Sequence, residues 1–163
     1  MILSKHKTIK SISCNVSNSI YKGETTLKII QDFNISVPTN FSGSLNRPIP
    51  ASPSNITLAA FGLAVNEANS DVLLISTVAV QSLLGIPEVV LSAFRNSEVI
   101  STVRVSTLAV NETRNITFQV LDDNPPMGYH SYRLTAEVAN PLLNQASAVG
   151  PISFSGTSFA PGV

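Results

Sequence analysis

The residues whose types could perform catalysis or bind a metal are few in this chain, and they are far apart in the sequence. His6 and His130 are the only histidines, and neither has a cysteine or carboxylate at the spacing of a known motif. His130 alternates with apolar Tyr132 and Leu134, which favours a packed structural histidine over a ligand or base. The sequence therefore predicts no catalytic residue, metal site or cofactor, and we expect a protein that is not an enzyme.

The segment Asp122–Gly128, with the sequence DDNPPMG, is the one place where several oxygen ligands are close together in the chain. It lacks the twelve-residue spacing of an EF-hand calcium loop. Aspartate, asparagine, proline and glycine are also the residues that turns prefer, because they tolerate or fix unusual backbone angles. The pattern therefore favours a plain turn over a calcium site.

Cys14 is the only cysteine, so the chain cannot form an intramolecular disulfide. A free thiol without a role is one interpretation. An intersubunit contact, in which Cys14 bridges two copies, is the other interpretation that an odd cysteine permits.

Composition and charge exclude several classes of partner. The chain has 163 residues, of which 44% are hydrophobic and 12% charged, enough for one domain with a sizeable core. Its net charge is zero, which argues against binding nucleic acid or an anionic membrane. No window approaches 18 consecutive apolar residues, and the N-terminal sequence MILSKHKTIKSIS lacks the apolar core of a secretory signal. We expect neither a membrane span nor a signal peptide.

The elements that would position any functional residue are strands, and the clearest are two runs within Ile86–Ser106. Both runs are rich in β-branched residues, and the short polar break Arg95–Glu98 separates them, as in a β-hairpin. Between residues 55 and 163 the same period of two recurs, with turn residues between the runs. The predicted strands are Ile56–Asn66, Asp71–Gln81, Ile86–Arg95, Glu98–Ala109, Glu112–Leu121, Gly128–Ala139 and Ala148–Phe159.

This pattern predicts an all-β fold, an antiparallel jelly roll or β-sandwich with an extended N-terminal connector arm. We divide the chain into an arm with a Pro-rich spacer, residues 1–54, and a jelly-roll body, residues 55–163. The spacer, Arg47–Ser54, has three prolines in six residues and should be extended and semi-rigid.

A jelly roll has eight strands and the predicted body supplies seven, so the eighth should come from the arm, within Thr25–Val37. That strand could fold back onto its own body or reach a neighbour's, and a donated strand would link copies head-to-tail into a fibre. The candidate contact residues are the apolar side chains of the arm: Leu27, Ile29, Ile30, Phe33, Ile35 and Val37.

Three stretches, in this order, carry a resemblance to a known group of proteins. They are PEVVLSAFRNSEVISTVRV at 87–105, GYHSYRLTAEV at 128–138 and AVGPISFSGTSF at 148–159. The chain resembles Bacillus-type spore-surface jelly-roll proteins, which include exosporium proteins and subunits of fibrous, pilus-like endospore appendages. The resemblance covers about residues 56–159 and leaves the arm unmatched. One residue departs from the pattern: Ser97 stands where the family has a turn glycine.

The resemblance implies a structural subunit on the spore surface, in the exosporium or coat, made in the mother-cell cytoplasm. Its partners would be further copies of itself and other spore-surface proteins at the fibre base or tip. Together with the arm, this gives the primary hypothesis, a homopolymer that assembles by strand donation. A second hypothesis is a trimeric binding module of the tumour-necrosis-factor or complement-head type (TNF/C1q-like), and a third is a viral fibre or capsid jelly roll.

Overall fold

The computed structural model describes residues 27–107 and 109–161, which form two antiparallel sheets without a helix. The all-β fold predicted from the alternation is therefore confirmed. The strands are β1 (Ile30–Thr39), β2 (Arg47–Ile49), β3 (Ile56–Val65), β4 (Asp71–Leu84), β5 (Glu88–Arg95), β6 (Glu98–Ser106), β7 (Thr113–Asp123), β8 (Gly128–Val138) and β9 (Gln145–Phe159).

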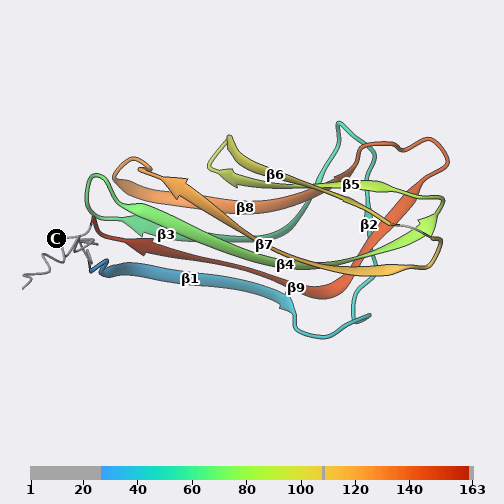
Figure 1. The fold of residues 1–163 in the computed structure, drawn as a ribbon, viewed down its shortest axis with the longest axis horizontal. Helices are drawn as coiled ribbons and strands as arrows, with labels where there is room; N and C mark the ends of the chain where they lie inside the picture. Colours follow the sequence, from blue (N-terminus) through green and yellow to red (C-terminus); the bar gives the residue numbers. More distant parts are fainter. Residues whose placement is uncertain (1–26, 108, 162–163) are drawn as a thin grey trace, which may run out of the picture.

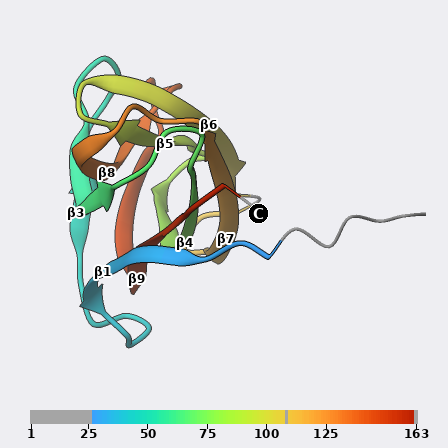
Figure 2. The ribbon, with the colours of Figure 1, turned by 90° about the vertical axis from the view of Figure 1, so that its left-hand side faces the viewer.

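The strand order is that of a jelly roll. One sheet has the order β1-β9-β4-β7, with β2 also paired to β9, and the other has the order β3-β8-β5-β6. Successive strands from β2 to β5 and from β6 to β9 alternate between the two sheets, as the jelly-roll topology requires. Figure 1 shows the first sheet in front, and Figure 2 shows the two sheets end-on, enclosing the core between them.

The core follows the alternation of the strands. In β8 the side chains of His130, Tyr132, Leu134, Ala136 and Val138 are all buried, as their shared face predicts. Phe61 of β3 lies against them, and its ring centroid is 5.8 Å from that of Tyr132 and 5.0 Å from that of Phe154 in β9. These rings hold the two sheets together at the centre of the sandwich.

The strand expected from the arm is β1, and it pairs antiparallel with β9 of the same chain. A second short strand was not expected. Arg47–Ile49, predicted as part of an extended spacer, forms β2 and pairs with Ala146–Ala148, so that Ile49 is buried. Proline is compatible with this strand because β2 lies at the edge of the sheet, where an N–H on the open side is not needed.

Two residues with left-handed backbone angles, one in a turn and one within β9, lie in the stretches that the sequence singled out. In the β5–β6 hairpin, Arg95 pairs with Glu98, and Asn96 has the left-handed φ of 53°. Asparagine tolerates that region, so the turn forms without a glycine at position 97. Gly150 has a φ of 82°, and a Cβ there would lie 2.6 Å from the carbonyl oxygen of Phe41. Only glycine fits this position of the Gly150-Pro151-Ile152 element.

Candidate assembly interface

The six apolar residues predicted as assembly contacts are all exposed in the structure. Ile30, Phe33, Ile35 and Val37 lie in β1, and Leu27 and Ile29 immediately precede it. Their exposed fractions run from 39% for Val37 to 70% for Leu27. Large apolar side chains are seldom exposed in such a run on a monomer, so this strand has the composition of a contact surface.

The polarity of β1 is inverted relative to an ordinary sandwich strand. Phe33 and Ile35 pair with Thr157 and Ser155 on the outer face of the sheet, whereas Asn34 and Ser36 pair with Gly156 and buried Phe154 on the inner face. The inner face of β1 is therefore polar and the outer face apolar. The fold does not use the apolar side chains of β1 to fill its core.

The polar face of β1 instead closes one side of the sandwich. Asp32 Oδ2 accepts a hydrogen bond from the backbone N–H of Ala64, and Asn34 Nδ2 donates one to the carbonyl oxygen of Gly62, each 2.8 Å long. Asp32 Oδ1 and Asn34 Oδ1 accept hydrogen bonds from the backbone N–H groups of Phe33 and Ile35, respectively. Asp32 and Asn34 thus satisfy backbone groups of both β1 and β3, which protects two strand edges from unwanted pairing.

The apolar surface of β1 continues across the sheet. Phe33 is in register with Thr157, Leu73 and Leu121, and Ile35 with Ser155, Ile75 and Gln119. Ile75 is 39% and Leu121 59% exposed. The outer-face patch is defined here as Phe33, Ile35, Leu73, Ile75 and Leu121.

The members of this patch in β4 and β7 were missed by sequence reasoning, although β4 carried a signal. Its start reads Val72-Leu73-Leu74-Ile75, four apolar residues in succession, so both of its faces are apolar there. A half-buried strand needs only one apolar face, and the second one marks a surface that could be covered by a partner.

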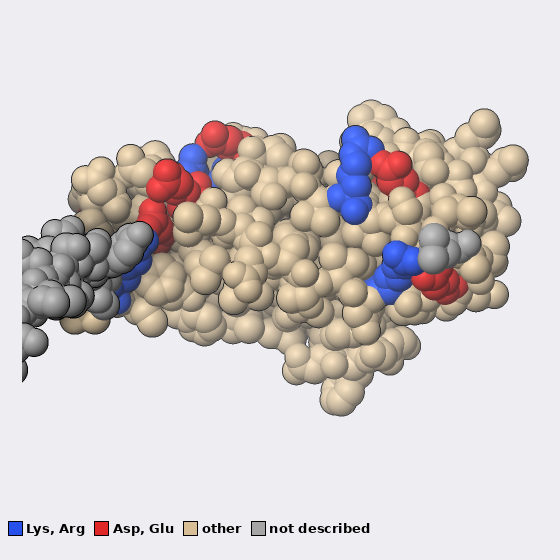
Figure 3. Space-filling model, in the orientation of Figure 1, with Lys and Arg blue, Asp and Glu red and all other residues tan. Residues whose placement is uncertain are grey.

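Charged side chains gather in two groups on the face seen in Figure 3, one toward each end, and the strip between the two groups is uncharged. The ion pairs of these groups include Lys28 with Asp71, Arg104 with Glu88, and Arg114 with Glu112. The hydrogen bond and charge of Lys28 hold the pKa of Asp71 below its usual range, against the opposing effect of its burial. These charges are paired within the chain, so they leave the middle of the face to apolar contacts and hydroxyl groups.

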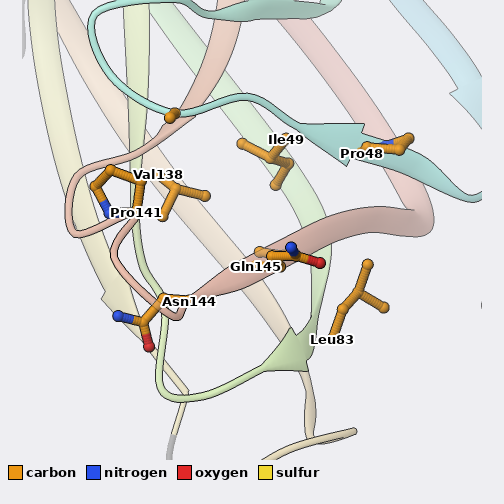
Figure 4. Close-up of a pocket in the computed structure, with 9 residues that line it drawn as sticks. Pro48, Ile49, Leu83, Val138, Pro141, Asn144 and Gln145 are labelled. Atoms are coloured by element: carbon orange, nitrogen blue, oxygen red, sulfur yellow. The ribbon is translucent and has the colours of Figure 1, made fainter.

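A pocket of about 400 Å³ lies at one end of the sandwich. Figure 4 shows Ile49 of β2 and Val138 of β8 on one side and Leu83 of β4 on the other, with Gln145 between Ile49 and Leu83. No lining residue is charged, and the amide of Asn144 is hydrogen-bonded to the backbone of Ile86, Asn140 and Leu142. The pocket thus presents no group that could act as an acid, base or nucleophile.

A buried polar cluster joins the two sheets at the start of β8. Asp122 of β7 accepts hydrogen bonds from the Tyr132 hydroxyl at 2.8 Å and from Arg95 at 2.7 Å, and Arg95 also bonds Glu98 at 2.6 Å. Burial and the hydrogen bond to Asp122 raise the pKa of the Tyr132 phenol well above its ordinary value. The cluster is satisfied internally, which is the arrangement of a structural network.

His130 has the structural role that its alternation predicted. Its side chain is buried, Nε2 lies 2.6 Å from the carbonyl oxygen of Pro126, and Nδ1 lies 3.2 Å from the side-chain nitrogen of Asn96. The carbonyl requires Nε2 to donate, and Nδ1 is placed to accept from Asn96. His130 therefore fastens the turn before β8 to the β5–β6 hairpin.

Within residues 27–107 and 109–161, no group of three or more His, Cys, Asp or Glu side chains is placed to hold a metal ion. The same residues contain no helix of the length and apolarity that crossing a bilayer requires. Cys14, the candidate intersubunit contact, lies outside the described residues, as does His6.

No protein-family model and no curated protein matches the chain. Among solved structures, it is similar to the infectious bursal disease virus particle, with 11% identity and a TM-score of 0.48 over 80% of this chain and 36% of that one. It is also similar to the VP2 subviral particle of that virus, with 11% identity and a TM-score of 0.46 over 94% and 43% of the two chains. The C-terminal CBM6 of a laminarinase from Zobellia galactanivorans has 13% identity and a TM-score of 0.36 over 77% and 98%. The chain thus spans about a third to less than half of the viral proteins, and none of these similarities carries a functional conclusion.

Proposed function

We propose that the chain is a structural, self-assembling subunit of a spore-surface fibre, without enzymatic activity, that polymerises head-to-tail through its N-terminal arm. The observation that carries the proposal is the exposure of all six apolar arm residues on or beside a strand that other side chains hold in place. The spore-surface location, in the exosporium or coat, and the partners at the fibre base or tip come from the family resemblance alone.

The exposed arm can supply the free energy of a contact. Burying one large aliphatic or aromatic side chain contributes about 1.5–3 kcal/mol. Four or five partly exposed side chains would together offset a large part of the entropy lost on association. A monomer gains nothing from keeping them in water. The proposed junction therefore has to cover them with a surface of the next copy in addition to the β1–β9 pairing, which leaves Phe33 and Ile35 on the outer face.

Strand exchange offers a specific geometry for the junction. β1 pairs with β9 of its own chain from Ile30 to Thr39. The same register between β1 of one copy and β9 of the next would make the contact heterologous, and a heterologous contact that does not close produces a fibre. Residues 40–46, which include Gly43, connect β1 to β2. In the exchanged arrangement, this loop would direct β1 away from its own body and toward the next copy.

The test is negative-stain electron microscopy of the full chain beside the double variant Ile29→Asp with Phe33→Asp. We expect filaments from the parent and folded particles without filaments from the variant, because two carboxylates cannot be buried at the junction. Val99→Asp with Val110→Asp is the matched control, since each valine is 50% exposed and lies outside β1. Filaments that persist in the first variant would refute the role of the arm.

The pairing of β1 within one chain favours, as a second candidate, a compact trimeric binding module with the arm tucked against its own body. Such a module would form discrete trimers at all concentrations. Sedimentation velocity over a dilution series separates the two functions, because only a head-to-tail polymer lengthens with concentration.

A further inference from the structure

We propose that the outer face of the β1-β9-β4-β7 sheet is a lateral contact surface, which packs against the same face of a second copy about a two-fold axis. The inference deepens the proposed function, on which it rests for the premise of self-assembly. It names a second, sideways contact, which shares Phe33 and Ile35 with the candidate residues of the head-to-tail junction and adds Leu73, Ile75 and Leu121 of β4 and β7.

The outer-face patch is contiguous. Its five residues occupy two adjacent rows that run across β1, β4 and β7, and the β9 positions between them are the small residues Thr157 and Ser155. Phe33, the largest member, is 56% exposed. A continuous apolar area that crosses the whole width of a sheet is the usual core of a protein–protein contact.

The rest of the face between the charged rows can be covered without burying an ion. Next to the patch, the hydroxyl oxygens of Thr77 and Thr117 lie 3.0 Å apart and hydrogen-bond to each other. These two hydroxyl groups therefore keep their hydrogen bond to each other when a second copy covers them. The outward positions of β4 from Leu73 to Gln81 and of β7 from Thr113 to Leu121 carry no charge, so a partner desolvates no ion there.

The area of the sheet face is close to that of a stable interface. The β4–β7 pairing runs from Asp71 to Gln81, and four strands lie side by side. Eleven residues at about 3.3 Å each and four strands at about 4.8 Å give a face of roughly 700 Å². A stable interface takes about 800 Å² from each partner. Sheets also pack face to face readily, about 10 Å apart.

The charges favour a second copy over the chain's own first residues as the occupant. Residues 1–26 contain four lysines and one glutamate. The carboxylates at outward positions of β4 and β7 lie only in the Asp71–Asp123 row beyond the patch, where Asp71 is already paired with Lys28, so the patch itself offers a basic segment no carboxylate. A second copy presents the same uncharged rows, and a two-fold contact requires only that the surface be complementary to itself.

The test uses the full chain with Leu27→Asp and Ile29→Asp, two changes outside the patch that block the head-to-tail junction. Sedimentation equilibrium should show a dimer of this parent. Adding Ile75→Lys and Leu121→Lys should yield a monomer, with the dimer weakened at least about 100-fold, because the two lysines would be buried without partners. Adding Val99→Lys instead, at an exposed position of the other sheet, should leave the dimer unchanged.

Three results would overturn the lateral contact. The first is a parent that stays monomeric at about 1 mM, since contacts weaker than that are not specific. The others are a dimer that persists after the two lysine substitutions, and a dimer that Val99→Lys disrupts equally. If the lysine variant fails to fold, Ile75→Thr with Leu121→Thr keeps strand-forming residues and should also dissociate the dimer. Filament formation by the unmodified chain is scored separately, so failure of the head-to-tail junction does not affect this result.

Discussion

The side-chain amide of Asn34 donates a 2.8 Å hydrogen bond to the carbonyl oxygen of Gly62, and so joins the edge strand of one sheet to the edge strand of the other. The same asparagine accepts the N–H of Ile35 through Oδ1. The Asn34 amide thus bonds backbone groups of β1 and β3, two strands that belong to different sheets. With Asp32, it closes the β1–β3 side of the sandwich without adding a strand.

Replacing Asn34 by aspartate should loosen this side of the sandwich. The carboxylate keeps the acceptor for Ile35, but it faces the Gly62 carbonyl with a second acceptor. We expect a loss of about 1–3 kcal/mol in the free energy of unfolding, measured by urea denaturation. Backbone amide exchange in β1 should accelerate at the same time. Asn40→Asp, at an exposed position after β1, is the control and should change stability little. Equal losses in the two variants would contradict the assigned role.

Tyr132 should make the fold sensitive to alkaline pH. Its phenol pKa is raised in the folded state by burial and by Asp122, so its stabilising contribution is complete below the unfolded value of about 10 and is lost as pH rises above it. Tyr132→Phe removes the bond to Asp122, and at neutral pH it should cost about 1.5–3 kcal/mol. Above pH ~10 the difference between the two proteins should shrink. The check is to measure denaturant midpoints of both proteins across pH 8–11, roughly the range around an ordinary tyrosine pKa. A difference between parent and Tyr132→Phe that stays constant over this range would contradict the burial of the phenol.

Two glycines offer a matched pair of substitutions to alanine. A Cβ on Gly156 would lie 2.7 Å from the ring of Phe61, which is fixed in the core. A Cβ on Gly62 would meet the ring of Tyr129, which is 73% exposed and can swing into solvent. We expect Gly156→Ala to cost about 1–3 kcal/mol and Gly62→Ala less than about 0.5 kcal/mol. Thermal unfolding of both variants tests this, and similar costs would show that Tyr129 is held as firmly as Phe61.

The fold could be predicted from the sequence to the extent that side-chain alternation defined it. β8 places His130, Tyr132 and Leu134 inward as their spacing requires, and the strand sought within Thr25–Val37 is present as β1. β2 could not be predicted in this way. Pro48 within β2 and Pro50 directly after it are typical of a spacer, and only the neighbouring edge of β9 makes a strand of this segment.

The candidate site was predictable in composition but not in orientation. In any strand, Phe33 and Ile35 share one face and Asp32 and Asn34 the other. Alternation could not show which face lies inward, because the partners of the polar side chains are backbone groups of β3, and these leave no trace in a side-chain pattern. Leu121 was missed for a related reason: a single exposed leucine in a strand has meaning only beside its neighbours in the sheet.

Because the polarity of β1 is inverted, its alternate residues have two separate roles. The inward polar residues hold the strand in place, and the outward apolar residues form the surface. A slip of β1 by a single residue along β9 would turn Asp32 and Asn34 to solvent and bring Phe33 and Ile35 against the backbone of β3, where no partner for the N–H of Ala64 would remain. Asp32 and Asn34 therefore fix the register of β1 on β9. They fix which side chains the subunit shows to its surroundings, while the exposed residues between them are free to diversify without endangering the fold.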